Sequence, residues 1–119
     1  MRDLTVRLAD IRTAAADILS LVEELDEQAF AALPETDCRT YRAIKNALAE
    51  LGEATKQLPP EVLAAQRNID CRGFAGLCDI VTHQYFSVEL SRLWPTVNDE
   101  PPALLVAIDV ELRRLSSPP

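Results

Sequence analysis

The chain has 119 residues, of which 48% are hydrophobic and 26% charged, with a formal net charge of −7. These values are ordinary for one globular domain that buries a core, so we expect a single domain over residues 1–119. The acidic balance disfavours non-specific binding to a phosphate backbone, and contact with nucleic acid would need a local basic patch. The candidates for that patch lie in the middle of the chain: Arg39, Arg42, Lys45, Arg67 and Arg72.

The N-terminal segment lacks a continuous apolar run, and no stretch approaches the ~20 apolar residues of a membrane span. We therefore expect no signal peptide and no membrane contact. The three cysteines lack a C-x-x-C pair, and Cys71 and Cys78 would lie ~10.5 Å apart along a helix, which is too far for a disulfide. We interpret them as reduced thiols of a cytoplasmic protein. A single histidine without a second ligand at metal-binding spacing does not favour a structural zinc site.

Apolar residues alternate in steps of three and four from Leu4 onward, which predicts a helix over residues 4–28 with one apolar face. A proline-containing turn ends it, and Thr36 or Asp37 can cap the next helix. The same spacing then predicts a second helix over residues 38–57. A glycine inside it, at position 52, indicates close packing against a neighbour.

Two consecutive prolines end the second helix, and Pro60 can begin a short third segment. Asp70 is an expected N-cap for a helix over residues 70–84, and Ser87 can cap the next segment, which Pro95 should break or kink. A last helix should follow after residue 102, with one apolar face formed by Leu105, Ile108, Leu112 and Leu115. Short connections make neighbouring helices antiparallel, so we predict an all-α, up-and-down bundle of four or five helices.

The predicted helix over residues 70–84 has two different faces. Its apolar stripe comprises Phe74, Leu77, Cys78, Val81 and Tyr85, and its polar side comprises Arg72, Gly76, Asp79 and His83. Asp79 precedes His83 by one helical turn, so its carboxylate can orient the imidazole and favour its charged form, or can make only a weak exposed contact. Gly76 leaves room on this side for another backbone or a ligand.

This segment resembles the signature of HEPN domains, and specifically of the HepT-like toxins in nucleotidyltransferase–HEPN toxin–antitoxin pairs. The residues that match in order and spacing are Gly76, Leu77, His83, Tyr85, Val88 and Trp94. Cys78 stands where that family has an arginine, and Asp79 stands where it has an asparagine. The similarity extends roughly from Tyr41 to the C-terminus.

The resemblance implies a homodimeric helical bundle with endoribonuclease activity, as in type VII-like toxin–antitoxin systems. It implies that the arginine and histidine of two protomers meet at the dimer interface and cleave RNA through its 2′-hydroxyl, without metal or cofactor. It also implies that a nucleotidyltransferase antitoxin silences the toxin by adenylylating Tyr85. That chemistry needs an exposed phenol, whereas the position of Tyr85 on the apolar stripe is also typical of a core residue.

Two functional interpretations follow from the matched and missing residues. His83 can transfer protons near neutral pH, although a histidine can also simply hydrogen-bond at a helix end. Cys78 cannot replace a guanidinium and suits a small buried hydrophobe. Arg72 of a second protomer could supply the charge, or could be a solvated side chain. We therefore expect either a weakened ribonuclease, which Cys78→Arg would improve, or an inactive HEPN protein that binds a nucleotidyltransferase.

Overall fold

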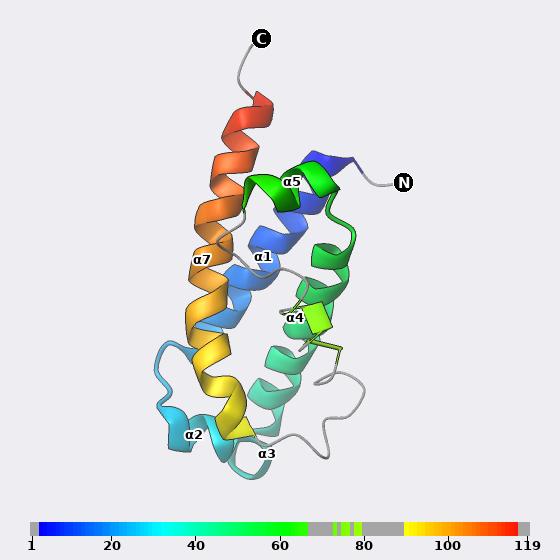
Figure 1. The fold of residues 1–119 in the computed structure, drawn as a ribbon. Helices are drawn as coiled ribbons and strands as arrows, with labels where there is room; N and C mark the ends of the chain where they lie inside the picture. The colour runs from blue at the N-terminus through cyan, green and yellow to red at the C-terminus, as the bar shows by residue number, and fades with distance from the viewer. Residues whose placement is uncertain (1–2, 67–72, 74, 77, 80–89, 117–119) are drawn as a thin grey trace.

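A computed structural model of the chain describes residues 3–66, 73, 75–76, 78–79 and 90–116, and within them every regular element is a helix. The helices are α1 (Leu4–Val22), α2 (Glu27–Ala31), α3 (Leu33–Thr36), α4 (Cys38–Lys56), α5 (Pro60–Ala65) and α7 (Leu90–Ser116). The long helices α1, α4 and α7 run side by side, α2 and α3 close one end of the bundle, and α5 crosses near the other (Figure 1). The predicted all-α bundle is confirmed.

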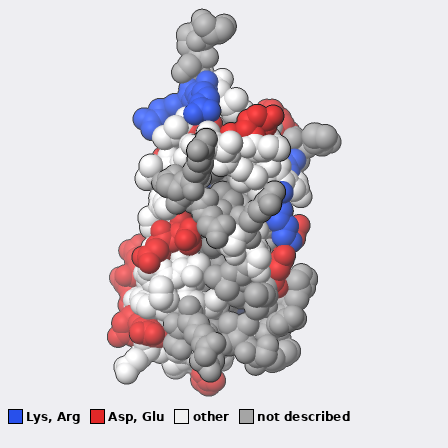
Figure 2. Space-filling view, viewed as in Figure 1, with Lys and Arg blue, Asp and Glu red and all other residues white. Residues whose placement is uncertain are grey.

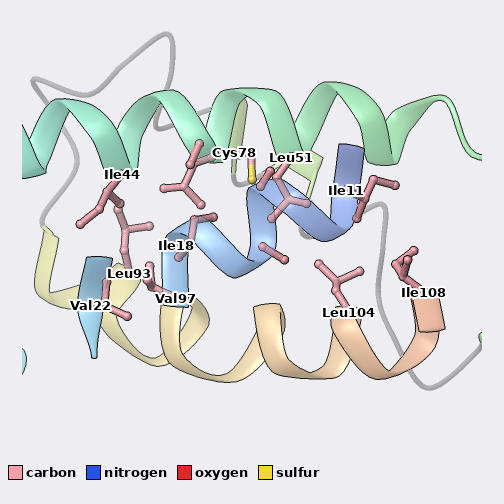
Figure 3. Close-up of a cluster of buried hydrophobic side chains, with 14 of the residues drawn as sticks. Ile11, Ile18, Val22, Ile44, Leu51, Cys78, Leu93, Val97, Leu104 and Ile108 are labelled. Atoms are coloured by element: carbon pink, nitrogen blue, oxygen red, sulfur yellow. The ribbon is translucent and has the colours of Figure 1, made fainter. Parts of the chain in front are cut away.

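Helix α1 is the centre of the bundle, because it packs against both α4 and α7. Its predicted apolar face is buried at Leu8, Ile11, Ala15, Ile18 and Val22. The two flanking helices contribute further core residues, among them Ile44, Leu48 and Leu51 from α4 and Leu93, Val97, Leu104 and Ile108 from α7 (Figure 3). None of the described helices is long and apolar enough to cross a bilayer.

The first helix is shorter than the sequence predicted, since it ends at Val22 and not at residue 28. The physical reason is a competing start signal. The side chain of Asp26 accepts a hydrogen bond from the backbone N–H of Ala29 at 2.7 Å, which caps the separate helix α2. Pro34 then lies in the first turn of α3, where its missing N–H costs nothing.

Helix α4 begins where the sequence predicted. The Asp37 carboxylate accepts from the backbone N–H of Thr40 at 3.2 Å and from its hydroxyl at 2.6 Å. These bonds, that of the hydroxyl first, lower the pKa of Asp37 because they stabilise its charged form. The helix ends at Lys56, one residue before the predicted end, and Pro60 begins α5 as expected.

The C-terminal part differs most from its prediction, because one 27-residue helix, α7, continues through Pro95, Pro101 and Pro102. The prediction of two separate helices in this part of the chain is therefore wrong. Burial along α1 outweighs the backbone hydrogen bonds that the prolines remove, and Pro101 itself is fully buried. The predicted apolar face is also displaced: Ile108 is buried, but Leu115 is 48% exposed near the C-terminal end of α7, which projects past α5 (Figure 1).

Candidate functional site

The structure describes one part of the predicted site. Gly76, Cys78 and Asp79 have helical backbone, as the sequence predicted for them. Arg72, His83 and Tyr85 lie outside the described residues, and so does the Ser87 cap. The described part therefore establishes what stands at the family's arginine position and at the position after it.

Cys78 points into the bundle, where it is 1% exposed and lies beside Leu51 between α4 and α1 (Figure 3). The neighbouring helix α4 approaches this position closely at Gly52. A Cβ atom built on Gly52 would lie 2.6 Å from the Cβ of Cys78, which is shorter than real carbon contacts allow. The close packing predicted for Gly52 is confirmed, and its partner is Cys78.

Burial controls the chemistry of the Cys78 thiol. Desolvation, followed by the negative charge of Asp79, raises the pKa of Cys78 to about 12. The thiol is therefore protonated at neutral pH and cannot act as a nucleophile or supply a positive charge. The predicted role as a small buried hydrophobe agrees with this geometry.

Asp79 points to the outside of the same helical segment and meets Lys56, the last residue of α4. The Lys56 ammonium donates to the Asp79 carboxylate at 2.6 Å and to Glu53 at 3.2 Å. The Lys56 and Asp79 side chains are 39% and 38% exposed, so solvent reaches both. The hydrogen bond to Asp79, then that to Glu53, raises the pKa of Lys56. The described partner of Asp79 is therefore Lys56, and the predicted pairing with His83 remains a prediction.

An open groove of about 450 Å³ lies beside this ion pair. Its lining residues come from the end of α4, from α5 and from the helical segment: Thr55, Lys56, Leu58, Pro60, Leu63, Ala75, Gly76 and Asp79. Gly76 is exposed, and a Cβ built on it would have no neighbour within 4 Å among the described residues. This groove is the space that the sequence predicted beside Gly76, and Lys56 and Asp79 both line it.

Two further sequence predictions concern the surface and metals. Arg39 and Arg42 are exposed on α4 and Lys45 is half-buried there, whereas Arg67 and Arg72 are outside the described residues, so the complete basic patch remains a prediction. Among the described residues, no three His, Cys, Asp or Glu side chains are grouped closely enough to hold a metal ion.

Sequence reasoning missed Lys56, because its contact with Asp79 spans 23 residues and follows no local motif.

Comparison with known proteins defines the class of this bundle. The model of the family described as "Ribonuclease HepT-like" matches residues 11–110, so the chain belongs to the HepT-like ribonuclease family. Relatives over most of the chain include a candidate RNase of Methanocaldococcus jannaschii, 30% identical over 87% of this chain and 85% of its own. Another, named a probable ribonuclease HepT, from Thermococcus cleftensis, is 32% identical over 75% and 81%. No solved structure matches the sequence significantly.

Proposed function

We propose that the protein is the HEPN toxin of a type VII-like toxin–antitoxin system, a cytoplasmic endoribonuclease of reduced activity. Membership of the HepT-like ribonuclease family and the ribonuclease names of its relatives support the reaction class. We expect the activity to be reduced because Cys78 is buried, which leaves the family's arginine position without a positive charge.

The proposed reaction is transesterification within RNA. The 2′-hydroxyl attacks the adjacent phosphorus, the bond from phosphorus to the 5′-oxygen breaks, and a 2′,3′-cyclic phosphate and a 5′-hydroxyl result. His83 would accept the proton of the 2′-hydroxyl as its oxygen attacks, and the leaving 5′-oxygen would receive a proton from an imidazolium, that of the second protomer. No redox change occurs, and we expect no cofactor.

The negative charge that develops on the phosphate in the transition state requires a cation on the same side of the helix as His83. Lys56 is the described candidate, because its ammonium already reaches Asp79, one helical turn before the position of His83 in the sequence. Lysine offers a point charge and not the planar fork of a guanidinium, which agrees with a slower reaction. Arg72 remains a second candidate from the sequence.

The site is proposed to be completed by a homodimer. Gly76 leaves open space beside Asp79, so a second copy can approach the polar side of the helix closely. A two-fold contact would place the same side of both protomers opposite each other and bring two His83 side chains together. Light scattering at micromolar concentration should give more than the 13.2 kDa monomer mass, and a monomer would argue against this arrangement.

RNA cleavage by the purified protein tests the activity. We expect slow cleavage that survives EDTA, yields cyclic phosphate ends, and disappears in His83→Ala. Cleavage that EDTA abolishes, or that His83→Ala retains, would refute the proposed reaction. A thermal melt of the variant shows whether it is folded.

Regulation is proposed to act on Tyr85. A cognate nucleotidyltransferase would join the phenolic oxygen to the α-phosphorus of ATP and release pyrophosphate. Incubation with both should add adenylyl mass to the peptide containing Tyr85, and Tyr85→Phe should abolish that gain. Labelling of Tyr41 alone would disprove the assignment.

The alternative function is an inactive HEPN protein that serves as a binding partner of a nucleotidyltransferase. The same buried Cys78 favours it, since the family's cation is missing. Stable binding to the cognate nucleotidyltransferase, together with no RNA cleavage above that of His83→Ala, would establish the alternative over the enzyme.

A further inference from the structure

The outer side of α7 carries an apolar strip that none of the other described helices covers. Val106 is 66% exposed, the largest value among the exposed large hydrophobic residues, and Val110 is 37% exposed. Pro102 is also exposed and Ala103 is half-buried. At 100° per residue this strip lies opposite Val97, Leu104 and Ile108, which face the core. We call Asp99, Pro102, Ala103, Val106, Val110 and Arg113 the outer seam.

The outer seam has the spacing of a helix–helix contact. Asp99, Ala103, Val106, Val110 and Arg113 follow one another in steps of four, three, four and three, the pattern by which two helices pack along a line. Its apolar centre lies between an acidic end and a basic end. Figure 2 shows basic atoms at the C-terminal end of α7 and acidic atoms farther along it.

We propose that the outer seam binds the outer seam of a second copy of this chain, with the two α7 helices antiparallel. Centred on Val106, this arrangement places Val106 against Val106, Ala103 near Val110, and Asp99 against Arg113 at both ends. The surface is therefore complementary to itself. A parallel arrangement would instead oppose like charges, with Asp99 on Asp99 and Arg113 on Arg113, which disfavours it.

Two local contacts near the basic end of α7 are compatible with this pairing. Arg113 donates its Nε to the backbone carbonyl of Asp109 at 3.3 Å on the exposed surface, and such a contact exchanges at little cost. Asp109 itself points toward α1 and pairs with Arg12 at 3.4 Å, so it does not compete for the seam. Because the apolar centre is short, the association should be weak, in the micromolar range of small interfaces.

This contact is separate from the homodimer proposed for the catalytic side. It uses only α7, whereas the catalytic side comprises the helical segment with Asp79 and the end of α4. If both contacts form, their two different two-fold axes link dimers into a larger assembly, which is a closed tetramer where the axes are perpendicular and intersect. The contact through the outer seam can therefore be tested independently of ribonuclease activity.

Cross-linking tests the central contact. In a Cys38→Ser, Cys71→Ser background, Val106→Cys is treated with a short bismaleimide, and Ala16→Cys, exposed on α1, is the matched control. We expect covalent dimers from Val106→Cys at least ten times faster than from Ala16→Cys at ~50 μM. Equal rates would overturn the proposal.

Charge exchange tests the antiparallel direction. Adding Asp99→Lys to the Val106→Cys protein should slow cross-linking severalfold, and a further Arg113→Glu should restore it. An unchanged rate in the first variant, or no recovery in the second, would overturn the antiparallel register. Val106→Glu in the otherwise native chain should lower the average mass in sedimentation at ~50 μM, and an unchanged mass would refute the interface.

Discussion

Neighbouring residues of the helical segment beside α4 have opposite surroundings. Cys78 is buried against Gly52 in the core, while Asp79, the next residue, pairs with Lys56 beside an open groove. The family's arginine position thus belongs to the packed side in this chain. Position 78 therefore serves core packing in this chain, and the charged groups described beside it lie on the open side.

Two glycines, Gly52 on α4 and Gly76 within the helical segment, make the same contrast. At Gly52 the backbones are so close that no Cβ fits, whereas at Gly76 there is room for a larger residue. Each glycine therefore reports on one side of the helix. Substitutions at these positions test whether the two sides differ in this way.

The largest expected effect is that of Cys78→Arg. A guanidinium forced into this site would lose its hydration and overpack the core, so the free energy of unfolding should fall by about 5 kcal/mol. This outcome replaces the gain of activity that the sequence alone suggested. Chemical denaturation measures it, with Cys78→Ala as the control that removes only the sulfur. A Cys78→Arg protein within 1 kcal/mol of the native one, by the same order-of-magnitude scale, would show that position 78 can reach solvent.

The next effect is a loss of stability at high pH. Because the folded pKa of Cys78, about 12, exceeds the ordinary thiol value of 9.0, the folded state holds its proton more tightly. The protonated Cys78 thiol therefore contributes to the free energy of unfolding. This contribution is fully present below pH 9 and is lost as the pH rises toward 12, by about 4 kcal/mol in total. Denaturation curves between these pH values measure it.

Cys78→Ala is the control for this pH dependence, because it removes the thiol and leaves the titrating lysines and tyrosines. Its stability should fall less steeply over the same interval. Parallel curves for the two proteins would mean that the thiol titrates normally and is accessible to water.

Alanine at the two glycines should have opposite signs. Gly52→Ala should lower the free energy of unfolding by about 1–3 kcal/mol, because the added methyl meets Cys78. Gly76→Ala should raise it by up to about 1 kcal/mol, since alanine favours a helix and its methyl would meet none of the described residues. Thermal melts of both variants measure these changes in stability. Changes of the same sign and size would contradict the contrast between the two sides of the helix.

Much of this arrangement was predictable from local signals. The regular apolar spacing, the Asp37 cap and the paired prolines located α4, and the apolar stripe placed Cys78 inside. The uninterrupted α7 was not predictable from Pro95, Pro101 and Pro102, because its stability comes from burial along α1. The end of α1 was missed because Asp26 caps a new helix.

The Lys56–Asp79 pair was also beyond sequence reasoning. Its two residues belong to different segments, which approach each other closely where Gly52 packs against Cys78. The roles of His83, Arg72 and Tyr85 remain predictions from the family signature.

The most direct test of the account compares RNA cleavage rates of Lys56→Gln and Cys78→Ala with that of the native protein. Lys56 is exposed and Cys78→Ala only removes a sulfur, so both variants should fold, which a thermal melt verifies. We predict that Cys78→Ala retains the native rate within about twofold, and that Lys56→Gln loses ~10²-fold because it removes the cation of the open side. A native rate in Lys56→Gln together with a large loss in Cys78→Ala would contradict the account.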